Sequence, residues 1–315
     1  MVSVIGFVIL PLTVLALFGY TFEGNIVTHG YSWLFFLQAI LLIGLIYGIN
    51  SERKREVGKK YSFDNIDFYN FITLLIGAYL SFVFNNYLKM GPVVASALVG
   101  VLSALMVPKF AVPAYCGSFV GMASCILFTT HVYLAFAAIV AGMVFVLSKN
   151  VFNGFGGKLG TIALTGCIIA SFFADKKVID ISPIPAWDTG KYLLLYSVIA
   201  AVISYVLNIR LKYGAVTGSG VVGLLAGLIM PQIFSEIGGS AAVMMICASF
   251  VGMSSQARLP NELYVALAAV LSTFLFIYSS PYFCGTGGKL GTIAFISCII
   301  IKGFLDILEK YKNNQ

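Results

Sequence analysis

One short motif in this chain has the residue types of an anion-binding loop, and it occurs twice. The sequence GGKLGTIA occupies residues 156–163 and recurs unchanged at residues 287–294, each time leading into an apolar run. Glycines allow positive φ and close approach of the backbone to a ligand. The free N–H groups of a helix N-terminus, with a lysine nearby, then form a cradle for negative charge. The motif predicts two half-sites for an anionic solute, with these candidate residues: Gly156, Gly157, Lys158 and Thr161 in the first copy, and Gly287, Gly288, Lys289 and Thr292 in the second.

Two other interpretations of this motif have different consequences. In one, the glycines form a capping turn and the lysine extends to the level of the lipid headgroups. In the other, the motif is a phosphate-binding P-loop, which needs a glycine where the first copy has Phe152 and a serine or threonine where it has Leu159. The second copy has Phe283 and Leu290 at these places. The P-loop pattern is therefore absent, and ATP hydrolysis is not expected.

A second motif is also present in two copies and combines glycine with serine. Residues 118–124 read SFVGMAS, and residues 249–255 read SFVGMSS. Small residues at this spacing allow two helices to pack closely, which is a purely structural role. The functional alternative is an unwound segment near the middle of the bilayer, where carbonyl and hydroxyl oxygens bind a solute or Na⁺. The candidate binding residues of this motif are Ser118, Ser124, Ser249 and Ser255.

Other chemistry-bearing residues are sparse. The six cysteines form no C-x-x-C pair, so free buried thiols are expected instead of a disulfide framework or a metal site. His131 aligns with Glu262 in the repeat described below. The two residues could form a proton site or a gate, or they could simply be solvated residues at the ends of helices. No Asp or Glu lies near the middle of a predicted span, which disfavours proton coupling through a buried carboxylate. Without a catalytic constellation, neither enzyme activity nor a cofactor is expected.

The composition of the chain indicates that membrane-spanning helices position these motifs. Of the 315 residues, 60% are apolar and only 10% are charged, whereas about 25% of residues are charged in an ordinary soluble domain. Such a chain cannot cover a soluble surface, so the sequence predicts an all-α polytopic membrane protein and excludes a secreted domain or cytosolic enzyme. The net charge of +7 does not imply a nucleic-acid partner, because the basic residues lie between apolar runs.

Apolar runs predict about 12 transmembrane helices. They lie near residues 3–21, 31–50, 67–88, 91–107, 113–130, 132–147, 159–174, 191–209, 215–231, 238–254, 263–280 and 289–307. The runs at 113–130, 159–174 and 238–254 are short enough to be broken or re-entrant. The basic loop 51–65 marks the cytoplasmic side, which predicts that both termini are cytoplasmic in a plasma (inner) membrane.

The two motifs belong to a longer internal duplication. Both recur at an offset of 131 residues (118 to 249 and 156 to 287), and residues 85–91 match 208–214 at an offset of 123. The chain then divides into two leading helices with the basic loop (1–66), repeat 1 (67–174), an extracytoplasmic linker (175–190), and repeat 2 with a short cytoplasmic tail (191–315). Each repeat has five predicted spans. An odd number of spans inverts the second copy, so a 5+5 inverted-topology repeat is expected.

This architecture is typical of secondary transporters and of several solute channels. The sequence therefore predicts a transporter or channel that moves a small hydrophilic solute, more readily an anion, through a path between the two repeats. One alternative is a flippase or transporter for an anionic lipid-linked substrate. Another is a non-transporting membrane subunit of a larger complex. The expected partners are the small-molecule solute and the lipid bilayer, and the two leading helices could join two copies as a homodimer.

Overall fold

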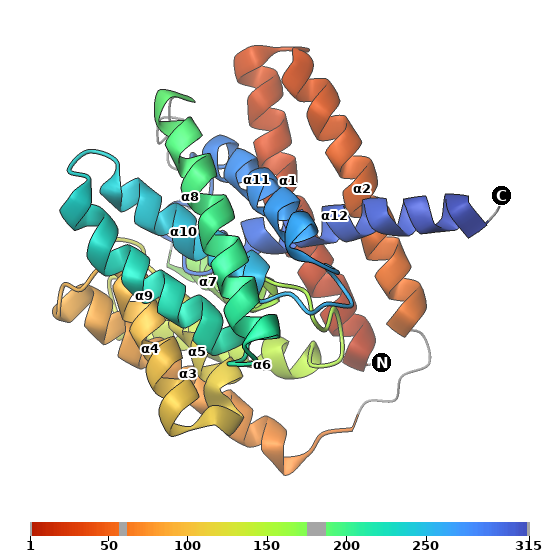
Figure 1. The fold of residues 1–315 in the computed structure, drawn as a ribbon. Coiled ribbons are helices and arrows are strands. Elements are labelled where there is room, and N and C mark those ends of the chain that lie inside the picture. The colour runs from red at the N-terminus through yellow and green to blue at the C-terminus, as the bar shows by residue number, and fades with distance from the viewer. Residues whose placement is uncertain (1, 57–61, 175–186, 314–315) are drawn as a thin grey trace.

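The computed structural model describes residues 2–56, 62–174 and 187–313, and its regular elements in these ranges are helices (Figure 1). The twelve α-helices are α1 (Val2–His29), α2 (Trp33–Glu56), α3 (Asn65–Phe82), α4 (Pro92–Met106), α5 (Ala111–Gly121), α6 (His131–Leu147), α7 (Lys158–Phe173), α8 (Trp187–Tyr205), α9 (Ala215–Ile233), α10 (Gly238–Gly252), α11 (Glu262–Tyr278) and α12 (Lys289–Asn313). Most of the predicted linker, residues 175–186, lies outside the described residues, as do Lys59 and Lys60 of the basic loop.

Within the described residues, six helical segments are long and apolar enough to cross a membrane. They are Ile5–Thr28, Trp33–Arg55, Asn65–Tyr87, Trp187–Arg210, Ala215–Ile233 and Lys289–Asn313. Helices α4, α6, α7, α10 and α11 are apolar but have only 15 to 17 residues. A membrane-spanning helix needs about 20 residues. The structure therefore supports a helical membrane protein, while the number of spans stays a prediction.

Four predicted boundaries differ from the structure. Helix α1 continues to His29, eight residues beyond the end of the predicted run 3–21. The run at 113–130 is helical only as far as Gly121, because Met122 ends the helix and Asn85 donates a hydrogen bond to the Met122 carbonyl (3.4 Å). Helix α2 continues to Glu56, so its last turns replace the start of the predicted basic loop. Helix α12 continues to Asn313 through the predicted tail, and Asp306, near the end of the predicted run, is largely buried. Glu52 and Arg55 pair with charged side chains far away in the chain, which accounts for the extension of α2.

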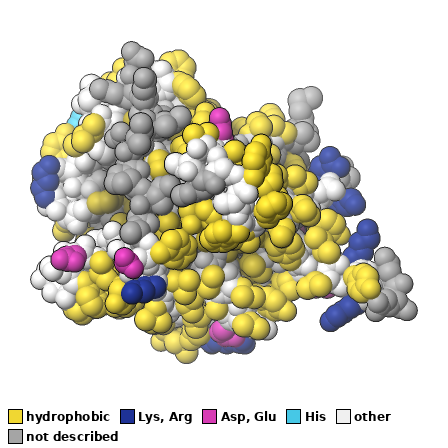
Figure 2. Space-filling view, turned by 90° about the horizontal axis from the view of Figure 1, so that it is seen from above, with side chains coloured by type: hydrophobic (Ala, Val, Ile, Leu, Met, Phe, Trp, Pro, Cys, Tyr) yellow, Lys and Arg dark blue, Asp and Glu magenta, His cyan; other side chains and the backbone are white. Residues whose placement is uncertain are grey.

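The leading helices α1 and α2 form a hairpin beside the rest of the bundle (Figure 1). Both are apolar all round: Leu10 and Leu45 are fully buried, while Leu12 and Ile43 on the outer faces are each 60% exposed. A helix that is apolar on every side suits a lipid environment. Among the described side chains on the face seen in Figure 2, hydrophobic ones predominate and charged ones are few.

The two sequence copies adopt the same unusual local conformations. Helix α3 ends in a π-helical turn at Val83–Tyr87, and α8 ends in one at Val206–Arg210. Every described non-glycine residue with positive φ belongs to a matched pair: Lys89 (56°) with Lys212 (59°), and Phe152 (53°) with Phe283 (54°). Positive φ is uncommon for bulky residues. The duplication therefore preserves backbone shape as well as sequence.

Helices α7 and α12 cross at the glycines of the GGKLGTIA motif. A Cβ atom on Gly160 would lie 2.5 Å from the Cα of Gly291, and one on Gly291 would lie 2.6 Å from the Cα of Gly160. A Cβ on Gly157 or Gly288 would likewise collide with backbone of the opposite helix. The two backbones approach so closely that only glycine fits at the crossing.

We expect Gly160→Ala to destabilise the protein. Its methyl group has no room at the crossing, and overpacking of this kind costs about 1–3 kcal/mol. Gly239→Ala in α10 is the matched control: no atom lies within 4 Å of its Cβ position, so alanine should stabilise the helix by about 0.5–1 kcal/mol. Thermal unfolding of both variants in detergent measures the difference. Equal melting temperatures would contradict the close crossing.

Candidate functional site

The two motifs identified in the sequence lie against each other, and they do so across the two copies. The Ser255 N–H donates to the carbonyl of Gly154 (2.8 Å), and the Ser124 N–H donates to the carbonyl of Gly285 (2.9 Å). The loop before α7 thus contacts the end of α10, and the loop before α12 contacts the end of α5. In the first of these contacts, the Gly156 N–H also donates to Oγ of Ser254 (3.0 Å).

Close packing explains the glycines in these loops. A Cβ on Gly156 would collide with the Phe250 carbonyl oxygen, and a Cβ on Gly287 would collide with that of Phe119. The Phe119 and Phe250 rings themselves contact each other with centroids 4.7 Å apart, and Tyr115 completes a buried aromatic cluster. The hydroxyl of Tyr115 shares a hydrogen bond with Ser219 (3.0 Å). The aromatic cluster and the α7–α12 crossing together form the centre of the candidate site.

The motif lysines interact with the carbonyl ends of the preceding helices. Nζ of Lys158 donates to the carbonyl of Ser148, which follows α6 (2.7 Å), and to the Asn153 side chain (3.1 Å). Nζ of Lys289 donates to the carbonyl of Ser279, which follows α11 (2.7 Å), and to that of Ser280 (3.1 Å). Cations near a helix C-terminus are favourable because they offset its partial negative charge. The structure thus gives the two lysines one equivalent bond, to the carbonyls of Ser148 and Ser279, and different second partners.

The two motif threonines differ in their hydrogen bonding. Thr161 and Thr292 are both fully buried. Oγ1 of Thr292 donates to the carbonyl of Gly288 (3.2 Å), whereas Oγ1 of Thr161 has no hydrogen-bond partner. A buried polar group without a partner costs about 1–3 kcal/mol. Thr161 therefore presents an unsatisfied hydroxyl on the first turns of α7, beside the crossing.

The predicted serines divide into two groups. Ser118 and Ser249 are fully buried and hydrogen-bond to Ser96 and Ser219, each at 2.8 Å. These bonds hold each SFVGM helix to the preceding helix of its own copy. Ser124 and Ser255 lie in the loops after α5 and α10, where they contribute the contacts between copies given above. The structure brings Ser124 and Ser255 to the GGKLGTIA loops, whereas the side chains of Ser118 and Ser249 bond within their own copies.

The paired asparagines and the His131–Glu262 pair also have defined partners. Asn85 and Asn208 donate to carbonyls at the ends of α5 and α10 (3.4 and 3.1 Å). His131 hydrogen-bonds Tyr87 (2.9 Å) and Glu262 pairs with Arg210 (2.7 Å), at equivalent joints of the two copies. Among the described residues, no group of three or more His, Cys, Asp or Glu side chains could hold a metal ion.

A buried ion network joins the leading helices to the second copy. Arg258 donates to both carboxylate oxygens of Glu52, which is 1% exposed, and to the carbonyl of Asn153 (2.9 Å). Arg55 links Glu52 (2.8 Å) to Asp306, whose carboxylate also pairs with Lys302 (2.8 Å). Sequence reasoning missed this network because it treated residues 51–65 as a loop. The sequence signal for a longer helix was a row of residues spaced three or four apart that continues along α2 as far as Glu52. The row consists of Leu34, Gln38, Leu41, Leu45, Gly48 and Glu52.

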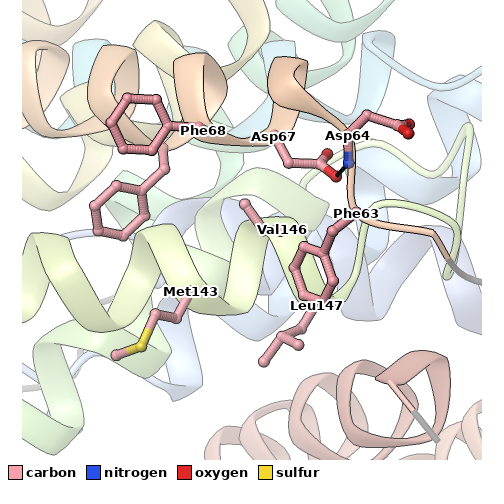
Figure 3. Close-up of a pocket in the computed structure, with 8 residues that line it drawn as sticks. Phe63, Asp64, Asp67, Phe68, Met143, Val146 and Leu147 are labelled. Carbon is pink, nitrogen blue, oxygen red and sulfur yellow. Dashed lines mark hydrogen bonds between the residues drawn. The ribbon is translucent and has the colours of Figure 1, made fainter.

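A separate cavity lies between the start of α3 and the end of α6 (Figure 3). Its volume is 480 Å³, and its lining is mostly apolar, with Phe68 and Met143 among the residues drawn. Asp67 lies at one end, where it accepts a hydrogen bond from the Asp64 N–H (3.0 Å) and pairs with Lys149 (2.7 Å). None of the twelve predicted binding residues lines this cavity.

The fold and site are those of an all-helical protein with several helices suited to a bilayer. No protein-family description, curated protein or solved structure matches the chain. Its function must therefore be inferred from the contacts themselves.

We expect Glu52→Gln to destabilise the protein strongly. Removing one member of a buried ion pair typically costs about 3–5 kcal/mol, because the partner charges remain buried. The double variant Glu52→Leu/Arg258→Leu should recover much of this loss, since the first copy has the buried Leu127 at the position equivalent to Arg258. Thermal unfolding in detergent tests both. A double variant less stable than Glu52→Gln would contradict the expectation that leucines can replace the buried pair of Glu52 and Arg258.

Proposed function

We propose that this protein is a membrane transporter or channel that moves a small hydrophilic solute along the interface between its two repeats. The observation that carries the proposal is that equivalent residues of the two copies contact each other, Phe119 with Phe250 and Gly160 with Gly291. Equivalent residues can touch only where a two-fold relation between units has its axis. The motifs with solute-binding chemistry are therefore gathered at that axis, which is where such proteins bind their substrates.

The directions of equivalent helices support an inverted repeat. Arg258, shortly before α11, donates to the carbonyl of Asn153, shortly after α6 (2.9 Å). At the opposite ends, Ser124 before α6 bonds Gly285 after α11 (2.9 Å). Helices α6 and α11 occupy equivalent places in the sequence copies and run in opposite directions. This favours two halves related by an axis in the membrane plane, with both termini on the cytoplasmic side of a plasma membrane.

Broken helices at the centre favour binding of a solute there. Helices α5 and α10 end, and α7 and α12 begin, at the contacts between copies. The first-turn N–H groups of α7 and α12 carry partial positive charge, which supports an anionic solute. The unsatisfied hydroxyl of Thr161 supplies a neutral hydrogen bond. In this proposal the lysines stabilise the loop ends and add positive charge around the site.

The cavity of Figure 3 favours a second candidate, in which the substrate is a lipid-linked anion. An apolar cavity of 480 Å³ could hold part of an acyl chain. The positive charge of Lys149 beside it is already paired with Asp67 (2.7 Å), so the apolar lining alone carries this candidate. A soluble solute would not use this cavity. Competition by short-chain anionic lipids, but not by the corresponding soluble anions, would favour the lipid candidate.

A thermal-stability screen identifies the class of solute. Inorganic anions, carboxylates, cations and neutral solutes are added to the purified protein, and a ligand of the native state raises its melting temperature. We expect an anion to stabilise the wild type and this effect to disappear in Lys158→Gln/Lys289→Gln. Lys310→Gln/Lys312→Gln at the exposed end of α12 is the control. An anion that stabilises both variants equally would exclude the motif lysines from the site.

Thr161→Val tests the proposed path directly. Valine has nearly the same shape and removes only the unpartnered hydroxyl, so the folded protein should be at least as stable. If Thr161 binds the solute, flux into proteoliposomes of the solute found by the screen should fall about three- to tenfold, the value of one hydrogen bond. Thr292→Val is the matched control, since that hydroxyl is already bonded to Gly288. Unchanged flux in Thr161→Val would exclude Thr161 from the path.

A further inference from the structure

A second polar position lies outside the repeats, on the inner face of α2. Gln38 is fully buried, and neither Oε1 nor Nε2 of its side chain has a hydrogen-bond partner. Its neighbours on that face are Leu34, one turn before, and Leu41, one turn after, which are 5% and 8% exposed. Leu34 packs with Phe274, Ile277 and Tyr278 of α11. The carboxamide of Gln38 is therefore buried between two leucines of the same helix face, with two polar atoms unsatisfied.

Asn25 on α1 provides a third unsatisfied atom near the same end of the hairpin. Its side chain is 3% exposed, and Nδ2 has no partner. Asn25 lies four residues before the end of α1, and Gln38 lies five residues after the start of α2. In an antiparallel hairpin with a short turn, these positions are at nearly the same height, about 6–8 Å from the turn.

This position is distinct from the α7–α12 crossing. Helix α1 reaches that region through Thr13, whose hydroxyl hydrogen-bonds Thr165 one turn after Thr161 (2.8 Å). Asn25 is twelve residues further along α1, which corresponds to about 18 Å. The network around Glu52 is still further away, at the opposite end of α2.

The energetics favour an occupant that bonds these atoms. Each unsatisfied buried polar group costs about 1–3 kcal/mol, and a leucine at position 38 would avoid this cost while matching its neighbours. Two N–H donors and one carbonyl acceptor suit a molecule that both accepts and donates hydrogen bonds. The groups themselves carry no charge, so an ion would not be compensated there.

We propose that Gln38 and Asn25 form a buried binding site for an uncharged hydrogen-bonding molecule, either water or a small neutral solute such as an amide. The site lies between the leading hairpin and the second copy, near the hairpin turn. It is independent of the proposed transport path and would exist even in a protein that transports nothing.

Gln38→Leu is the decisive variant, measured in two ways. First, the melting temperature is measured with and without acetamide, the neutral probe, and with acetate as the charged comparison. At ten times its dissociation constant, acetamide should raise the melting temperature of the wild type by about 3 °C and leave that of Gln38→Leu unchanged. Second, hydroxyl-radical footprinting compares the extent of oxidation of Leu34 and Leu41 with that of Leu45. Leu45 is fully buried on the same face of α2.

The two readouts distinguish the sources of the ligand. A shift with acetamide that is lost in Gln38→Leu identifies a site for neutral solutes. Oxidation of Leu34 and Leu41 above that of Leu45, lost in Gln38→Leu, identifies bound water. The proposal is overturned if neither is observed, and a melting temperature of Gln38→Leu above that of the wild type then shows that the carboxamide is simply unsatisfied. If Gln38→Leu fails to fold, Gln38→Met replaces it in both measurements, because methionine also lacks the carboxamide.

Discussion

The contact of α7 with α12 at Gly160 and Gly291 is the constraint on which the rest of the arrangement depends. The two helix backbones approach closely enough to exclude even a methyl group. This approach places the two GGK loops on opposite sides of one point, and each loop then contacts the SFVGM helix of the other copy. The matched bonds of Lys158 and Lys289 hold the loops in that position by joining them to the ends of α6 and α11. Without the glycines, neither motif could contact its counterpart.

Around this centre, the two copies have the same scaffold and different attachments. The π-helical turns, the left-handed residues and the Asn85–Asn208 pair are shared. The leading hairpin is attached unequally: its ion network bonds Arg258 of the second copy, while the first copy has Leu127 at that position. The hairpin thus makes an otherwise repetitive molecule asymmetric, in packing and in buried polar groups.

Much of the helical framework could be predicted from hydropathy alone, because length and apolarity decide where helices form in a bilayer. Most predicted runs correspond to single helices within a few residues. The repeated motifs also drew attention to the segments that meet at the centre, although SFVGMAS and SFVGMSS differ at one position and the roles of their residues stay a prediction. The sequence marked the run 113–130 as short enough to be broken, but not where α5 stops, at Gly121 beside the bond of Asn85 to the Met122 carbonyl. It also did not reveal that α1, α2 and α12 extend; for α2 the reason is that Glu52 and Arg55 find their partners far away in the chain. The bonding of the motif lysines likewise depends on where α6 and α11 end.

The equivalent joints at His131 and Glu262 give the two ends of the molecule different physical sensitivities. One joint is a pair of stacked rings, with Tyr87 and His131 centroids 5.8 Å apart, and the other is an ion pair of Arg210 with Glu262 near the surface. Dissolved salt screens the attraction of exposed charges but hardly affects contact between rings. Ionic strength therefore acts on only one of two otherwise matching joints, so a change in the surrounding electrolyte would loosen one face of the bundle and leave the opposite face as it was.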